Sequence, residues 1–246
     1  MDYEISYLSP TEELVIGSGR DSDVFIEADT LTGLVGQVED TGVTTIGASG
    51  QAVAFGDRKI LPTEGGFTLV VKSADAWARA RRAFSTTRPG TLVVTATQRC
   101  TLPVRLTQPL PPPGVVPHTG ARIEVQLISD EGTWRIPNVS TTPTTIITNT
   151  GDAPIWPRIT WQGQGGAVTI PSSAAFTLPA VDTPHTIHTD RRRAGQVVDA
   201  TGVPAPEVAR QVDVVSEMVP VGQSRTWGIP DGARLEWDVE VLDPWT

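Results

Sequence analysis

The sequence predicts a mainly β protein made of two domains. Its 246 residues include 23 glycines and 21 prolines, and this combined share of about 18% favours turns while staying below the roughly 25–30% typical of disordered chains. Short segments rich in valine and threonine recur between these turns, a pattern typical of a sandwich or barrel. The length is sufficient for one large core or two smaller ones.

Strands are expected along the whole chain. The segments with alternating or β-branched residues are 3–8, 14–16, 23–27, 67–72, 92–96, 102–106, 121–128, 145–148, 155–161, 167–170, 174–178, 186–189, 196–199, 224–227 and 235–242. Closely spaced glycines at 33, 36, 42, 47, 50 and 56 indicate tight hairpins in that stretch.

One helix is expected at residues 73–84. Ser73 is a suitable N-cap because its hydroxyl can accept a hydrogen bond from a free backbone N–H. Asp75 in the first turn and arginines near the other end complement the helix dipole. Trp77, Ala80 and Phe84 form one apolar face. We therefore expect the helix to pack on the sheet of the first domain through Trp77 and Phe84.

Two segments suggest a domain boundary. The proline-rich run 109–114 cannot lie inside a helix or a central strand, because proline lacks the backbone donor. Residues 138–145 are rich in threonine and proline and form a second candidate linker. We place the boundary near 136–144, which gives domains 1–137 and 138–246. The run 109–113 is the alternative boundary, or a projecting loop of the first domain.

Charge and cysteine content exclude several classes of protein. The formal net charge of −9 argues against gripping nucleic acid or an anionic membrane surface. Cys100 is the only cysteine, so an intrachain disulfide and a multi-cysteine zinc site are both excluded. The first 13 residues are acidic and lack the basic start and apolar core of a signal peptide. We expect synthesis in a cytoplasm.

Two groups of residues are candidate metal sites. His185 and His188, with Asp182 and Asp190 nearby, could supply ligands, but three residues apart on a strand they point to opposite faces. The favoured interpretation is solvated strand residues. The segment 21–23 begins like a calcium loop, although its glycine and closing glutamate are not at the required spacing. No metal and no cofactor is predicted.

No set of residues reaches a catalytic proposal, so the chain is not predicted to be an enzyme. Residues 17–19 lack the strand-to-helix pattern of a phosphate loop, and Ser172 follows a proline as in a turn. The basic run 191–193 is interpreted as a solvated turn, with a subunit or phosphate contact as alternatives. Cys100 lacks a basic context that would activate its thiol.

The seven tryptophans allow two interpretations. They are Trp77, Trp134, Trp156, Trp161, Trp227, Trp237 and Trp245. Packing in a core or a subunit interface is the simpler account. A platform for stacking sugars is the functional one, and four of the seven lie between residues 156 and 237.

The order of these elements resembles the distal tail (Dit) proteins of siphophages. The similarity is carried by residues 58–60, the strand FTLVVK, the helix 73–84, the turn 88–90 and the strands LVVTA and LPVRL, followed by ARIEVQLISDEG. It continues through 149–152, 157–163, AVTIP, 191–202 and 232–245. Residues 1–56 match least well.

The resemblance implies a structural component of the phage tail tip. The N-terminal β-sandwich or split-barrel-like domain would form a hexameric ring that joins the tail tube to the tail-associated hub, with DNA passing through the lumen. The C-terminal, galectin-like β-sandwich would be peripheral, where receptor-binding fibres attach. Neither specific nucleic-acid binding nor membrane insertion is implied. The alternatives are a carbohydrate-binding module that recognises the host surface and a different tail component, such as a tube protein or baseplate adaptor.

Overall fold

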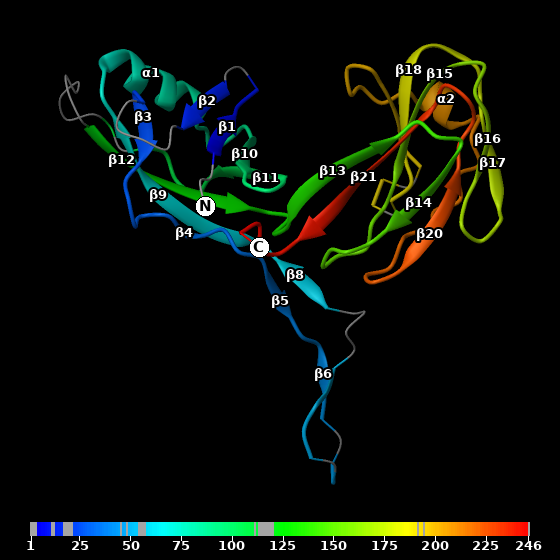
Figure 1. The fold of residues 1–246 in the computed structure, drawn as a ribbon, viewed down its shortest axis with the longest axis horizontal. Coiled ribbons are helices and arrows are strands. Elements are labelled where there is room, and N and C mark those ends of the chain that lie inside the picture. The colour runs from blue at the N-terminus through cyan, green and yellow to red at the C-terminus, as the bar shows by residue number, and fades with distance from the viewer. Residues whose placement is uncertain are drawn as a thin grey trace. The chain divides into compact units, whose positions relative to one another are not determined.

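The protein is mainly β, as the sequence predicts (Figure 1). The computed structural model describes residues 4–10, 13–16, 22–44, 46–47, 49–53, 58–110, 112, 121–190, 192–193 and 195–245. The chain divides into two compact units. The first contains the described residues of Met1–Arg135 and Val241–Thr246, and the second is Ile136–Glu240.

The first unit holds most of the early strands. They are β1 (Glu4–Leu8), β2 (Glu13–Ile16), β3 (Val24–Ile26), β4 (Thr32–Gly33), β5 (Gln37–Glu39), β6 (Gly42–Val43), β7 (Ala52–Val53), β8 (Lys59–Leu61), β9 (Thr63–Val71), β10 (Gly90–Thr95), β11 (Arg99–Leu106) and β12 (Ala121–Ser129). Antiparallel neighbours run in the order β2, β1, β10 and β11. The end of β11 also pairs β12, which pairs β9 along nine residues, so the sheet folds over at β11.

The folded sheet of the first unit encloses the first core. Alternate residues of its strands are buried, including Tyr7, Leu69, Leu102 and Leu127. This period of two is the signature of strands with one face toward a core. Burial raises the pKa of the Tyr7 hydroxyl to about 12.

Helix α1 (Ala74–Ala83) confirms the expected helix. The Ser73 hydroxyl accepts a hydrogen bond from the backbone N–H of Ala76 at 3.1 Å. Its buried side chains are Ala76, Ala80 and Ala83, and Phe84 directly after it is also buried. Of the two side chains expected to pack on the sheet, Phe84 is buried and Trp77 is half-buried. Alanines allow the helix to lie close to the strands, which leaves the large indole at the margin.

The second unit contains two antiparallel sheets. Its strands are β13 (Trp134–Ser140), which begins in the first unit, β14 (Thr144–Thr148), β15 (Arg158–Gly163), β16 (Gly166–Thr169), β17 (Ala175–Leu178), β18 (Val181–His188), β19 (Val197–Asp199), β20 (Ser224–Gly228) and β21 (Arg234–Val241). One sheet runs in the order β14, β20, β16 and β17, and the other includes β19, β18, β15 and β21. Trp227 and Ile147 are buried on the first, and Trp161 and Ile187 on the second. This arrangement is consistent with a sandwich.

Two features of this region differ from expectation. The segment 138–145 was expected to be a linker, but its first residues complete β13, in which Pro137 occupies an exposed position. Proline is tolerated in a strand where its missing N–H is not needed by the ladder. A short helix, α2 (Pro206–Ala209), was not predicted at all. No helix of the described residues is long and apolar enough to cross a membrane.

The chain passes between the units twice. It leaves the first unit after Arg135 and returns at Val241, so that the last residues belong with the first unit. The expected domains 1–137 and 138–246 did not include this return. The proline-rich run 109–114 lies mostly outside the described residues.

Candidate functional site

The histidine pair lies on a strand, as expected, but β18 spans Val181–His188 and so begins earlier than the expected strand 186–189. His185 Nδ1 lies 2.8 Å from the carbonyl oxygen of Thr183, and His188 Nδ1 lies 2.8 Å from Arg193 Nη1. Burial and the nearby Arg193 charge lower the pKa of His188. No group of three or more potential metal ligands occurs among the described residues. The two histidines are therefore not brought together as a metal site.

The other sequence candidates are also dispersed. Residues 17–19, Asp21 and Arg191 lie outside the described residues. Arg193 belongs to a turn in which its backbone N–H donates a hydrogen bond to Asp190 Oδ1 at 2.9 Å. Ser173 has a left-handed φ of 66°, as in the expected turn. Cys100 is buried, and this burial raises the pKa of its thiol.

The tryptophans contribute mainly to packing. Trp134, Trp161 and Trp227 are buried, and the other four are half-buried. The indole N–H of Trp161 donates to the carbonyl of Pro179, and Trp134 packs edge-on against Trp245 at 6.2 Å. A platform for sugars needs an aromatic face open to solvent. None of the seven offers a fully exposed ring.

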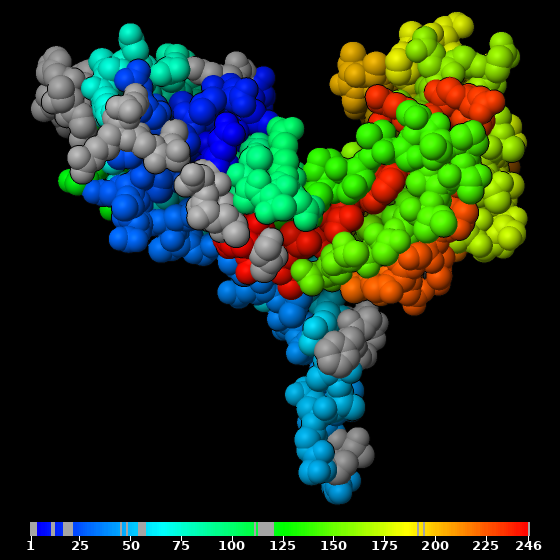
Figure 2. Space-filling model, viewed as in Figure 1, coloured from blue at the N-terminus to red at the C-terminus, as the bar shows by residue number. Residues whose placement is uncertain are grey.

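The most distinctive feature of the first unit is a hairpin arm, residues 37–61. Strand β5 pairs β8 from Gln37↔Leu61 to Glu39↔Lys59, and β6 pairs β7 farther out. Figures 1 and 2 show it standing clear of the rest of the first unit. Glycine spacing predicted several tight hairpins here, but the structure forms this single long one.

The arm has no core of its own. Of its described residues none is buried. Val43 and Ile46 near the tip are 65% and 103% exposed. An ion pair of 2.6 Å between Arg58 Nε and Asp40 Oδ1 is exposed and therefore contributes little. An isolated two-stranded hairpin is marginally stable in water, so this arm is suited to being completed by another surface.

The root of the arm, residues 34–36 and the groups bonded to them, is held firmly. The buried Trp134 donates its indole N–H to the Leu34 carbonyl at 2.7 Å. The Leu34 N–H donates to the carbonyl of Glu64 at 3.0 Å. The Thr63 hydroxyl donates to the Val35 carbonyl at 2.9 Å, and the Gly36 N–H donates to the Leu242 carbonyl at 2.8 Å. These bonds fix the direction in which the arm leaves the unit.

The root also contains strained backbone. Leu34 is fully buried with φ of 59°, a left-handed conformation uncommon outside glycine. Gly132 adjoins the root, since its carbonyl oxygen would lie 2.5 Å from a Cβ at Gly36. It adopts φ of 74° without strain, as glycine can, but a Cβ there would lie 2.0 Å from the Leu61 carbonyl oxygen. A left-handed conformation such as that of Leu34 persists only where the surrounding structure imposes it, and such residues concentrate at functional sites. The arm root is thus the best-defined candidate site in the described structure. In the sequence, only the closely spaced glycines indicated that this region is unusual.

Comparisons with known proteins complete the picture. No protein-family model matches the sequence, and no curated protein matches it. Solved structures do match it, over nearly the whole chain.

Three of the matching structures are phage proteins of a hub adsorption apparatus or a baseplate. The Dit protein of phage SPP1, described as a paradigm of the hub adsorption apparatus in phages that infect Gram-positive bacteria, has a TM-score of 0.53 at 9% identity and covers 96% of this chain and 98% of its own. A chain of the phage P2 baseplate in its activated conformation with calcium has a TM-score of 0.55 at 10% identity, covering 97% and 98%. The strontium form of the same baseplate gives 0.52 at 10% identity, with the same coverage. The resemblance indicated by the sequence is therefore confirmed in three dimensions: from end to end, this chain has the fold of the phage Dit and baseplate hub proteins.

Proposed function

We propose that this chain is a non-enzymatic structural component of a phage tail tip. Copies of it form a ring, hexameric by the family resemblance, between the tail tube and the tail-associated hub. The first unit forms the ring, and the second is peripheral, where receptor-binding fibres attach. The chain is made in the host cytoplasm and ends in the virion.

The projecting arm is the observation that carries this proposal. None of the described residues of the arm is buried, whereas the backbone groups at its root are hydrogen-bonded. Such a hairpin is suited to contacting a neighbouring molecule. In a ring every copy both extends an arm and receives one, so no arm is left without a surface. The fold likeness over 96–97% of the chain supports the same role.

The acidic composition fits a ring through which DNA passes. Six copies at −9 each carry a formal charge of −54. Acidic side chains at a lumen repel phosphate, whereas basic grooves bind it and release counterions. A ring with a neutral or basic lumen would contradict this part of the proposal.

Two measurements test the proposal directly. Sedimentation of the purified chain over a concentration series should show a discrete species near six times 26.2 kDa. Gold-labelled antibody against the chain should bind the tail tip of the particles. Label on the capsid, along the tube or nowhere on the particle would overturn the assignment to the tip.

An arm-deletion variant tests the part played by the arm. Glu39 and Lys59 are directly paired, so residues 40–58 can be replaced by Asn-Gly, which favours a tight hairpin turn. The shortened chain should stay folded, because none of the described residues removed is buried. It should no longer form the ring. A ring of unchanged stability would show that the arm serves another purpose.

A further inference from the structure

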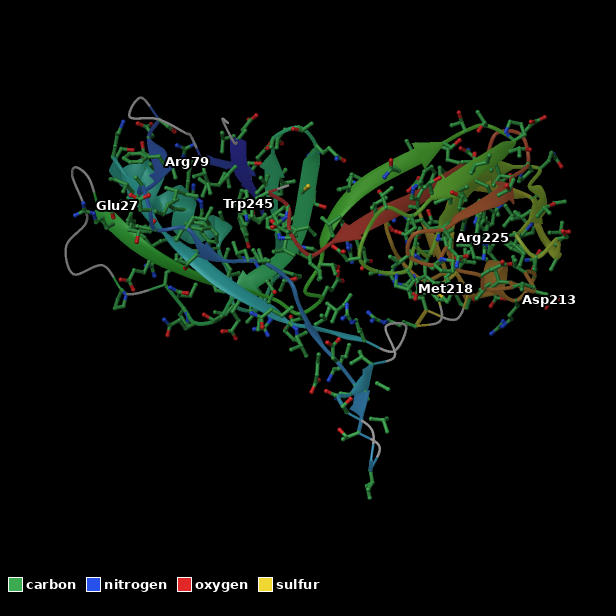
Figure 3. The ribbon with its side chains drawn as sticks, turned by 60° about the horizontal axis from the view of Figure 1, so that its bottom comes forward. Glu27, Arg79, Asp213, Met218, Arg225 and Trp245 are labelled. Atoms are coloured by element: carbon green, nitrogen blue, oxygen red, sulfur yellow. The ribbon has the colours of Figure 1, made fainter. Side chains whose placement is uncertain are left out.

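One sheet of the second unit has an outward face with no charged side chain among its described strand residues. Strands β14, β20, β16 and β17 bury alternate side chains, so the residues between these point outward. The outward residues, which we call the neutral face, are Thr144, Ile146, Thr148, Ser224, Thr226, Gly228, Ala167, Thr169, Ala175 and Thr177. Arg225, labelled in Figure 3, is paired with the buried Ile147 and therefore belongs to the inward face.

The other sheet of the same unit has the opposite character. Its outward positions on β15 and β21 include Arg158, Glu236 and Asp238, and Arg158 bonds to both carboxylates, at 3.1 and 2.7 Å. Charged side chains keep a surface hydrated and are depleted from the cores of protein interfaces. The contrast between the two sheets points to the neutral face as the contact surface of this unit.

The side chains of the neutral face favour a flat protein partner. All of them except Ile146 are small, so the strands of a second sheet can lie close against them. The face has no aromatic ring on which a sugar could stack and no cation that could hold a phosphate. One exposed isoleucine is too little apolar surface for a lipid layer.

The arm of the first unit has the matching composition. Its run 41–56 contains no charged residue in the sequence, and charged residues flank that run on both sides. The ion pair between Arg58 and Asp40 therefore marks where the charged part of the arm ends. Val43 and Ile46 within the run are exposed, and Figure 3 shows the outer part of the arm clear of the other strands of the first unit.

The dimensions of the two surfaces also agree. Residues 41–47 of an extended strand reach about 23 Å, at about 3.3 Å per residue. The four strands of the neutral sheet, about 4.8 Å apart, make a surface about 19 Å wide. The uncharged part of the arm is therefore long enough to cross the whole sheet.

We propose that the uncharged part of the arm of one copy packs across the neutral face of a second copy. The inference rests on the proposed ring and names the surface that receives each arm. The contact joins two different surfaces of one chain, as a head-to-tail ring requires. Because neither surface is charged, the affinity should change little between low and high salt, unlike that of a contact made of ion pairs.

Cross-linking between copies tests the contact directly. Ile46→Cys in one preparation and Thr226→Cys in another are mixed and treated with a short bismaleimide. A covalent dimer is expected from the mixture. Each variant carries a single added cysteine and the native Cys100 is buried, so the mixed product reports contacts between copies. The matched control replaces Thr226→Cys by Gln162→Cys, an exposed position on the other sheet of the unit.

Placing charge on the neutral face tests its energetic role. Thr169→Lys with Thr226→Lys should weaken self-association at least about tenfold in sedimentation velocity, because a buried charge without a partner is costly. The control is Gln162→Lys with Thr183→Lys, which adds the same charge at exposed positions of the other sheet. Unchanged circular dichroism confirms that each variant is folded.

Each outcome decides the matter. A cross-link specific to Thr226→Cys, together with loss of association only in the neutral-face lysine variant, supports the inference. Equal cross-linking of both cysteine positions, or a ring that tolerates the two lysines, overturns it and leaves the ring standing. A wild-type chain that stays monomeric at every concentration also overturns it, whereas the tail-tip role is then judged separately by antibody labelling of the particles.

Discussion

The root and the tip of the arm belong to one hairpin, but their backbones are held in different ways. At the root, the carbonyls of Leu34 and Val35 and the N–H of Gly36 bond to groups far along the chain. Toward the tip, β6 and β7 pair over only two residues each, and Ile46 is fully exposed. The difference separates two tasks: the root sets a direction, and the tip remains available for a surface that the single chain does not supply.

The largest expected effect is the loss of the indole at the root. Trp134→Ala should lower the free energy of unfolding by about 3–5 kcal/mol, because a fully buried ring and its hydrogen bond to Leu34 are removed. Ile46→Ala at the tip should change it by less than about 0.5 kcal/mol. Urea unfolding of both variants, at concentrations where the chain is monomeric, gives the comparison. Similar losses in both would mean that the tip is already packed in the monomer.

A pair of glycine substitutions sharpens the same comparison. Gly132 and Gly47 both have left-handed φ, 74° and 88°, so alanine is strained by a similar amount at each. At Gly132 the new Cβ would also collide with the Leu61 carbonyl, whereas at Gly47 nothing lies within 4 Å. Gly132→Ala should therefore be less stable than Gly47→Ala by about 1–3 kcal/mol. Thermal unfolding measures the difference, and equal melting temperatures would contradict the rigid root.

The smallest expected effect is a pH dependence confined to the second unit. The root bonds named above use backbone groups and the uncharged side chains of Trp134 and Thr63, so acidification should not alter them. His188 differs, because burial and Arg193 lower its pKa below 6.5. The folded state favours the neutral ring, so its contribution is present above pH 6.5 and is lost as the pH falls through the lowered pKa.

The histidine contribution can be isolated by substitution. Stability measured from about pH 8 down to about pH 5 should fall slightly more in wild type than in His188→Gln, which has no proton to bind. Once the pH lies below the lowered pKa, the difference between the two profiles should stop changing. Identical slopes would show that His188 is solvated more freely than its contact with Arg193 implies.

The sequence predicted features that depend on neighbouring residues. The Ser73 cap, the polarity of α1 and the strand carrying His185 and His188 follow from residues within one or two turns. The conformation of the arm root could not be predicted from neighbouring residues. Leu34 adopts its left-handed conformation because Trp134, 100 residues away, and Glu64 bond to it. Glycine spacing marks turns but does not say that Gln37 will pair with Leu61.

Two other misses have the same origin. Trp77 and Phe84 were expected to pack on the sheet because they are large and apolar, whereas the buried side chains within α1 are its three alanines and Trp77 is only half-buried. Residues 138–145 were taken for a linker because they are rich in threonine and proline. Residues 138–140 instead end β13 and residues 144–145 begin β14, because pairing with neighbouring strands, which no local pattern shows, extends both strands into this segment.

The double passage of the chain between the units has a consequence for how the chain responds to proteolysis. A peripheral domain at the end of a chain is released by one proteolytic cut. Here the second unit is joined to the first at both Arg135 and Val241, so after one nick between residues 136 and 240 each fragment still ends in a segment of the first unit, one in residues 1–135 and the other in residues 241–246. Release of the cut part then also requires residues 241–246 to detach from the first unit, where the Leu242 carbonyl accepts a hydrogen bond from the Gly36 N–H.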